Sequence, residues 1–101
     1  NQKQNFMKEK EQKDMDIKKV IKFWAPWCGP CRNYAPIFKK VASKYSDKIE
    51  FIDINVDSDD PETTHFKVRS IPYTVCIKED GSVLTKAGVL NEQELEKLIL
   101  S

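Results

Sequence analysis

Two cysteines separated by two residues are the part of this sequence best suited to chemistry. Cys28 and Cys31 lie in the segment WAPWCGPCR at 24–32, between a β-branched and aromatic run and an amphipathic helical pattern. The first turn of a helix offers unpaired N–H groups and a partial positive charge, which favour a thiolate. We therefore predict that Cys28 attacks an external disulfide. Cys31, one helical turn later, should then resolve the mixed disulfide.

Other roles for the cysteines are weighed against this one. Zinc usually takes four ligands, and the sequence adds only Cys76 and His65, neither spaced to complete a site. We expect no metal, although a zinc site and an inert thiol pair remain the alternatives. Cys76 lies in an apolar run and is expected to be buried, with a regulatory thiol as the alternative. His65 is expected on the surface of a short helix.

The length and charge of the chain limit its organisation and its partners. With 101 residues, we predict a single domain, with a polar N-terminal helix within 1–16 and a core over 18–100. A net charge of +1 gives no electrostatic reason to expect binding to nucleic acid or to an anionic membrane. Three cysteines exclude a secreted scaffold with every thiol paired. We expect a cytoplasmic protein, or an exported one if a signal was removed before Asn1.

Periodicity and turn residues predict an alternation of helices and strands. A first helix is expected at 2–14 and a last helix after a capping box of Asn91 and Glu94, with Leu95, Leu98 and Ile99 on its buried face. Between them we predict strands at 19–24, 49–56, 73–78 and 82–86, and helices at 29–45 and 60–66. Helices between strands favour parallel pairing, and the Asp80–Gly81 turn favours an antiparallel pair. The expected class is α/β, with a mixed sheet covered on both faces.

The motif around the two cysteines resembles that of the thioredoxin family. The sequence WCGPC at 27–31 matches the family residue for residue, and the resemblance runs over about 18–100. Ile71–Pro72 matches the family's cis-proline element, and Gly88 matches the glycine of the loop beside it. The resemblance implies the thioredoxin fold, a central mixed β-sheet of four or five strands flanked by helices on both faces. The family's first strand precedes its first helix. This chain begins too close to its expected first helix to supply that strand, so we expect the strand to be missing.

The same resemblance implies a protein disulfide reductase. It would work by dithiol–disulfide exchange through Cys28 and Cys31 and help to keep intracellular thiols reduced, with no bound cofactor besides that redox-active disulfide. The implied partners are disulfide-containing target proteins and an NADPH-dependent flavin enzyme, a thioredoxin reductase, and the chain would be a monomer. The uncharged Gly29 and Pro30 also favour electron donation, because no histidine stabilises the thiolate. An exported exchange protein and a non-catalytic binding module are the alternatives.

An apolar groove around Cys28 is a further implication of the resemblance. Its expected lining is Trp27, Ile71, Pro72, Ala87 and Gly88. A target segment would lie there extended, bonded to the backbone near Ile71. A cis bond at Pro72 would expose that backbone and keep a side chain away from the thiols.

One charged pair departs from the family. The family places a buried aspartate where Lys22 stands, and a lysine on the neighbouring strand where Asp53 stands. We predict that Lys22 and Asp53 form an inverted buried pair behind Cys31. A neutral lysine could accept the Cys31 proton, whereas a charged one would stabilise the thiolate. The alternative is that Lys22 reaches solvent along its stem and Asp53 stands alone.

Overall fold

The computed structural model describes residues 16–101, and the helix expected at 2–14 lies outside them. Two predicted elements have the expected bounds, α2 (Gly29–Tyr45) and β3 (Tyr73–Lys78), and the bounds of the others differ by one or two residues. These others are β1 (Ile17–Trp24), β2 (Glu50–Asn55), α3 (Pro61–His65), β4 (Val83–Ala87) and α4 (Glu92–Ile99). The capping box of α4 is confirmed, because the Asn91 side chain accepts from the Glu94 backbone and the Glu94 side chain accepts from Asn91.

The four strands form one mixed sheet in the order β2-β1-β3-β4. β1 runs parallel to β2 and antiparallel to β3, and β3 forms an antiparallel hairpin with β4. Gly81, in the hairpin turn, has a φ of 89°, which glycine adopts without steric cost. Within the described residues the sheet therefore has four strands, with β2 and β4 at its edges.

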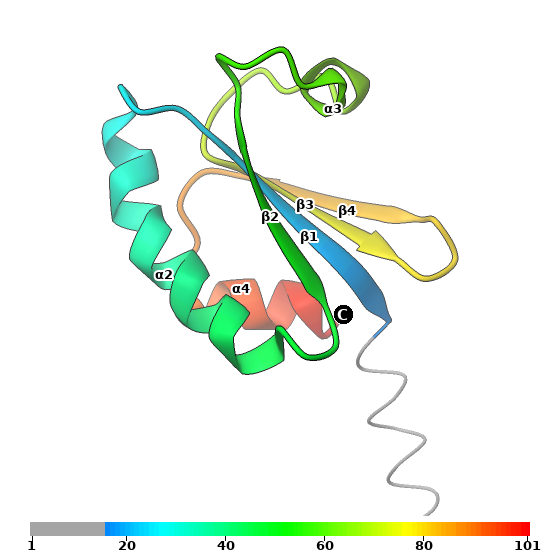
Figure 1. Cartoon of the computed structure of the whole chain (residues 1–101). Coiled ribbons are helices and arrows are strands. Elements are labelled where there is room, and N and C mark those ends of the chain that lie inside the picture. The colour runs from blue at the N-terminus through cyan, green and yellow to red at the C-terminus, as the bar shows by residue number, and fades with distance from the viewer. Residues whose placement is uncertain (1–15) are drawn as a thin grey trace, which may run out of the picture.

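Helices lie on both sides of the sheet. Figure 1 shows α2 and α4 together on one face and α3 on the other. The α2–α4 side holds the larger core, formed by Ile17, Val20, Tyr34, Phe38, Val41, Ile49, Cys76, Leu90, Leu95 and Ile99. The opposite side holds a smaller core of Ile21, Phe23, Ile54 and Val75, against which Phe66 and Val68 pack. β1 contributes residues to both cores, so it is packed on both faces before it passes into the loop that follows it.

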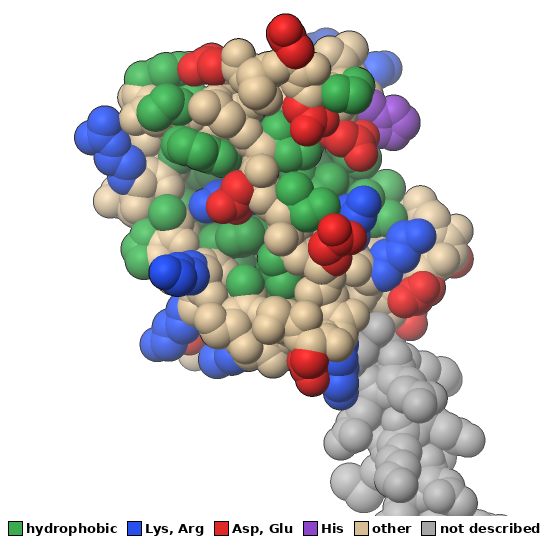
Figure 2. Space-filling model, viewed as in Figure 1, with side chains coloured by type: hydrophobic (Ala, Val, Ile, Leu, Met, Phe, Trp, Pro, Cys, Tyr) green, Lys and Arg blue, Asp and Glu red, His purple; other side chains and the backbone are tan. Residues whose placement is uncertain are grey.

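The surface carries both charges in close alternation. Figure 2 shows basic and acidic side chains interspersed over one face of the molecule, with apolar side chains between them. Three ion pairs join α2 to α4, namely Lys40–Glu92 at 2.9 Å, Lys44–Glu92 at 3.6 Å and Lys44–Glu96 at 2.7 Å. Such exposed pairs contribute little to stability, so the apolar contacts beneath them hold the two helices together.

Candidate active site

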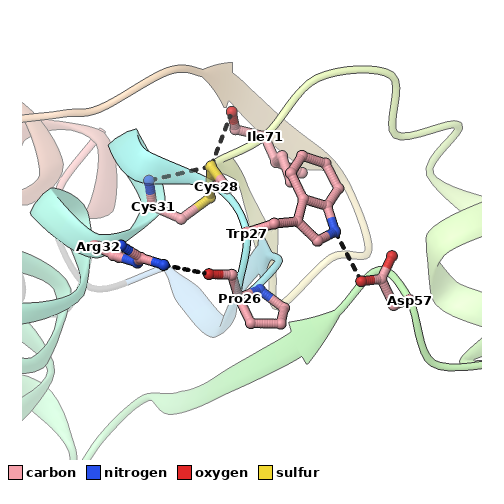
Figure 3. The surroundings of a disulfide bond; sticks show 7 residues. All are labelled: Pro26, Trp27, Cys28, Cys31, Arg32, Asp57 and Ile71. Carbon is pink, nitrogen blue, oxygen red and sulfur yellow. Dashed lines mark hydrogen bonds between the residues drawn. A yellow bond between two sulfur atoms is a disulfide. The ribbon is translucent and has the colours of Figure 1, made fainter.

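The two cysteines of the motif are joined where β1 passes into α2. Cys28 and Cys31 form a disulfide, with their Cα atoms 5.2 Å apart. Cys28 is the N-cap of α2, and its Sγ accepts a hydrogen bond from the Cys31 backbone N–H at 3.2 Å (Figure 3). The Cys28 N–H donates to the Ala25 carbonyl at 3.1 Å and closes the turn before the helix. A sulfur at this position receives the unpaired N–H groups of the first helical turn.

The residues between the cysteines fit the start of a helix. Gly29 and Pro30 occupy its first two positions, where the N–H that proline lacks would have no partner within the helix. The first turn of α2 carries no acidic side chain. The partial positive charge of the helix end is therefore available to a thiolate at Cys28.

Shielding alone does not distinguish the two sulfurs. Cys28 is 5% exposed and Cys31 3%, so the two residues are buried to a similar extent. Their surroundings differ instead. Cys28 Sγ lies 3.8 Å from the Ile71 carbonyl oxygen and follows the exposed Trp27, whereas Cys31 lines a cleft on the side of Lys22 and Asp53. The division of labour therefore depends on which surface each sulfur adjoins.

The residues expected around Cys28 are brought together by three separate loops. Trp27 is 66% exposed, and Ile71 packs against the cluster that contains both cysteines. The Ile71–Pro72 peptide bond is cis, as expected. The Gly88 N–H donates to the Pro72 carbonyl at 2.8 Å, and Ala87 pairs with Tyr73. Loops that are far apart in sequence thus form one surface beside the disulfide.

Two residues at this surface were missed by the sequence reasoning. Asp57 accepts a hydrogen bond from the Trp27 indole at 2.8 Å, and its own N–H donates to the Asn55 side chain at 2.9 Å (Figure 3). Val89 follows Gly88 and is 42% exposed. An apolar residue in a loop was a usable signal for Val89. No local pattern linked Asp57 to Trp27, because the two are thirty positions apart.

The predicted Lys22–Asp53 ion pair is present, with Nζ 3.5 Å from Oδ1. It is only half buried, however. Lys22 is 5% exposed, but the Asp53 side chain is 57% exposed because β2 is an edge strand. Both residues line a cleft of about 430 Å³ together with Cys31. The pair therefore lies behind Cys31, as expected, but its carboxylate remains in contact with water.

The third cysteine and the histidine lie elsewhere. Cys76 is fully buried in β3, and burial raises the pKa of its thiol to about 12. His65 is exposed on α3. In the part of the chain that the structure describes, no group of three or more His, Cys, Asp or Glu side chains is placed to hold a metal ion. No helix within 16–101 is both long and apolar enough to cross a bilayer.

The fold and the disulfide at the start of α2 define a thiol–disulfide oxidoreductase with a thioredoxin fold. The Thioredoxin family model matches residues 1–101, and the chain belongs to the thioredoxin family. It is 38% identical to thioredoxin of Haemophilus influenzae over 84 residues, and this match covers 83% of this chain and 78% of that protein. It is 34% identical over 82 residues to thioredoxin 1 of Synechococcus elongatus, which covers 81% and 77%.

Solved structures show the same relationship. The germline-specific thioredoxin Deadhead of the fruit fly is 32% identical, with a TM-score of 0.73, and the match covers 95% of this chain and 90% of that one. Fasciola hepatica thioredoxin is 30% identical, with a TM-score of 0.73 over 92% and 88% of the two chains. These matches confirm the predicted family and fold.

Proposed function

We propose that this thioredoxin-family chain reduces disulfides in target proteins, with Cys28 as the nucleophile and Cys31 as the resolving thiol. The observation that carries the assignment is the position of Cys28 at the N-cap of α2, where its sulfur accepts the Cys31 N–H. A thiolate formed there keeps this hydrogen bond and faces the positive end of the helix. The uncharged Gly29 and Pro30 add no further anion-stabilising charge, which favours electron donation.

The exchange proceeds in two displacements. The Cys28 thiolate attacks one target sulfur, forming a mixed disulfide, and the second target sulfur leaves as a thiolate that takes a proton from water. Cys31 then gives its proton to water, its Sγ attacks Cys28 Sγ, and the bond from Cys28 to the target breaks. The first target sulfur leaves as a thiolate, which takes up a proton from water. The two cysteines lose two electrons and the target disulfide gains them. The redox group is the Cys28–Cys31 disulfide itself, so the exchange uses no bound cofactor.

The surface beside Cys28 supports the binding of an extended target segment. Trp27 offers an exposed apolar ring, and Ile71, Pro72, Ala87 and Gly88 come from the two loops that adjoin it. An extended segment placed along Ile71 would hydrogen-bond to the backbone and place its disulfide against Cys28.

Membership of the thioredoxin family supports a proposal for the electron donor and for the cellular location. Regeneration of the dithiol requires a second protein that supplies two electrons, and we assign this role to a thioredoxin reductase that uses NADPH and flavin. Curated thioredoxins at 33–38% identity support this assignment. We propose a cytoplasmic protein. We also propose a monomer, because the whole exchange uses the cysteines of a single chain.

A disulfide-trapping experiment tests the proposal. The wild type should accelerate the reduction of insulin by dithiothreitol, followed by turbidity. Incubated with insulin in the absence of dithiothreitol, the reduced Cys31→Ser variant should instead accumulate a covalent adduct between Cys28 and insulin, visible by mass spectrometry under non-reducing conditions. Failure of the wild type to accelerate reduction, with insulin still bound, would identify a binding module and overturn the proposal. An adduct through Cys76 would overturn the assignment of Cys28.

A further inference from the structure

A buried lysine behind the resolving cysteine is not used by the exchange chemistry described above. Lys22 is 5% exposed, and on the described chain it and Thr74 are the buried polar residues. It shares a face of β1 with Val20, whose side chain packs in the core beneath α2. Burial of an ammonium group is unfavourable unless partners compensate it. The partners of Lys22 therefore decide what its charge does.

Two groups lie close to the Lys22 ammonium group. Asp53 Oδ1 lies 3.5 Å from Nζ, and among the described residues it is the one carboxylate within 4.0 Å. Nζ also lies 5.0 Å from the centroid of the Phe38 ring, an arrangement that favours a cation. The Asp53 side chain is 57% exposed, so water screens its negative charge. Asp53 thus holds the ammonium group in place but cancels only part of its field.

The remaining field acts in the cleft behind the active-site disulfide. This cleft, of about 430 Å³, is lined by Lys22, Asp53, Cys31, Arg32 and four uncharged residues. It therefore carries two positive charges and one negative charge beside Cys31. On the β3 side, Thr74 lies opposite Lys22 and bonds to the Tyr34 hydroxyl, whose pKa is raised to about 12, chiefly by burial. Neither of these two groups adds charge near neutral pH.

Resting on the proposed function, we propose that the Lys22 ammonium stabilises the Cys31 thiolate and so accelerates the resolving attack. Cys31 loses its proton to water, its Sγ bonds to Cys28 Sγ, and the bond from Cys28 to the target breaks with its electron pair on the departing sulfur. Lys22 keeps all its protons throughout. It is a positioning residue that acts through charge, in contrast to a neutral amine that would accept the thiol proton.

Stopped-flow reduction of dithiodipyridine by the full chain separates the two steps. This probe is uncharged, so the charge of Lys22 does not attract it. The first release of thiopyridone reports capture by Cys28, and the second reports resolution by Cys31. With Lys22→Met we expect the second phase to be about three- to tenfold slower at neutral pH, with its pH midpoint raised. The first phase should change less than about twofold, and Lys22→Arg should restore the second.

Two further variants keep the test decisive. Lys19→Met removes the other β1 lysine that pairs with a β2 carboxylate, at 4.0 Å from Glu50, and should leave both phases unchanged. Asp53→Asn alters an exposed side chain, so the fold should persist, and loss of its negative charge should lower the pH midpoint of the second phase.

The outcomes separate this inference from the proposed function. A folded Lys22→Met variant with an unchanged second phase would overturn the role of Lys22 alone. A slower second phase and a raised midpoint in Asp53→Asn would also overturn it, by making Asp53 the proton acceptor. If Lys22→Met does not fold, the pH midpoint of the second phase in Asp53→Asn decides between the charge of Lys22 and proton transfer to Asp53. Absence of the first phase in the wild type would instead overturn the proposed function.

Discussion

Cys28 and Cys76 carry the same thiol group in opposite surroundings. Cys28 caps α2, its sulfur accepts a backbone N–H, and an exposed tryptophan precedes it in the chain. Cys76 lies in the middle of β3, fully buried, where its thiol resists ionisation and its pKa rises to about 12. A helix end solvates a thiolate with N–H groups, whereas the centre of a strand uses those groups for the sheet. The position of a cysteine in its helix or strand therefore decides whether its thiol reacts.

Substitution of Cys28 should affect insulin reduction most, whereas substitution of Cys76 should affect it little. Cys28→Ser should abolish insulin reduction, because a hydroxyl group cannot form the mixed disulfide. Cys76→Ala should retain turnover within about twofold, because this thiol stays protonated near neutral pH. Both are measured by turbidity at equal protein concentration, with circular dichroism as the control for folding. Loss of turnover in a folded Cys76→Ala variant would mean that the buried thiol takes part.

High pH should lower the free energy of unfolding, because the Cys76 thiol and the Tyr34 hydroxyl are buried. Burial raises the pKa of Cys76 from 9.0 and that of Tyr34 from 10.0, each to about 12. The folded chain therefore holds these protons longer than the unfolded chain does. Its free energy of unfolding should fall as pH rises through this range, by about 1.4 kcal/mol per pH unit for each group.

Urea unfolding between pH 8 and about 12 measures this slope. Cys76→Ala should remove the part that begins near pH 9, where the unfolded thiol ionises. A stability that stays constant up to pH 12 would mean that burial raises neither the pKa of the Cys76 thiol nor that of the Tyr34 hydroxyl.

A smaller effect is expected from the hydrogen bond beside Cys76. The Tyr34 hydroxyl and Thr74 Oγ1 are 2.8 Å apart in the core. Tyr34→Phe should cost about 1–3 kcal/mol in urea unfolding, because it leaves a buried Thr74 hydroxyl without its partner. Adding Thr74→Val removes that unpaired group and should recover part of the loss. Equal stability of the wild type and Tyr34→Phe would mean that water already reaches this site.

Loss of the hydrogen bond between Trp27 and Asp57, near Cys28, should have a smaller effect. Asp57→Ala removes the hydrogen bond from Trp27 and should raise KM for insulin by about two- to fivefold. Reduction of dithiodipyridine, which is too small to use the groove, should be unaffected. Asp59→Ala, in the same loop, is the matched control. If both substrates slow equally, Asp57 acts on the sulfur and not on the placement of Trp27.

Elements with strong local signals were predictable from the sequence. The Asn91–Glu94 capping box and the helical spacing of Tyr34, Phe38 and Val41 fix their helices by contacts within a few residues. The bond between Cys28 and Cys31 was also predictable from local spacing, because two thiols one turn apart at a helix start are within reach of each other.

Features that depend on tertiary position were less predictable. Asp57 meets Trp27 only because two loops end side by side, and the exposure of Asp53 depends on β2 forming the sheet edge. The equal burial of Cys28 and Cys31 likewise comes from packing by Ile71 and Val56, which lie far away in sequence.

Alkylation of the reduced chain tests the central claim most directly. Iodoacetamide at neutral pH, followed by peptide mass mapping, gives the rate at each cysteine in the folded chain and in urea. If the start of α2 stabilises a thiolate, Cys28 reacts faster in the folded chain than in the unfolded one, while Cys76 reacts only after unfolding. A folded Cys28 that reacts no faster than the unfolded one would contradict the account.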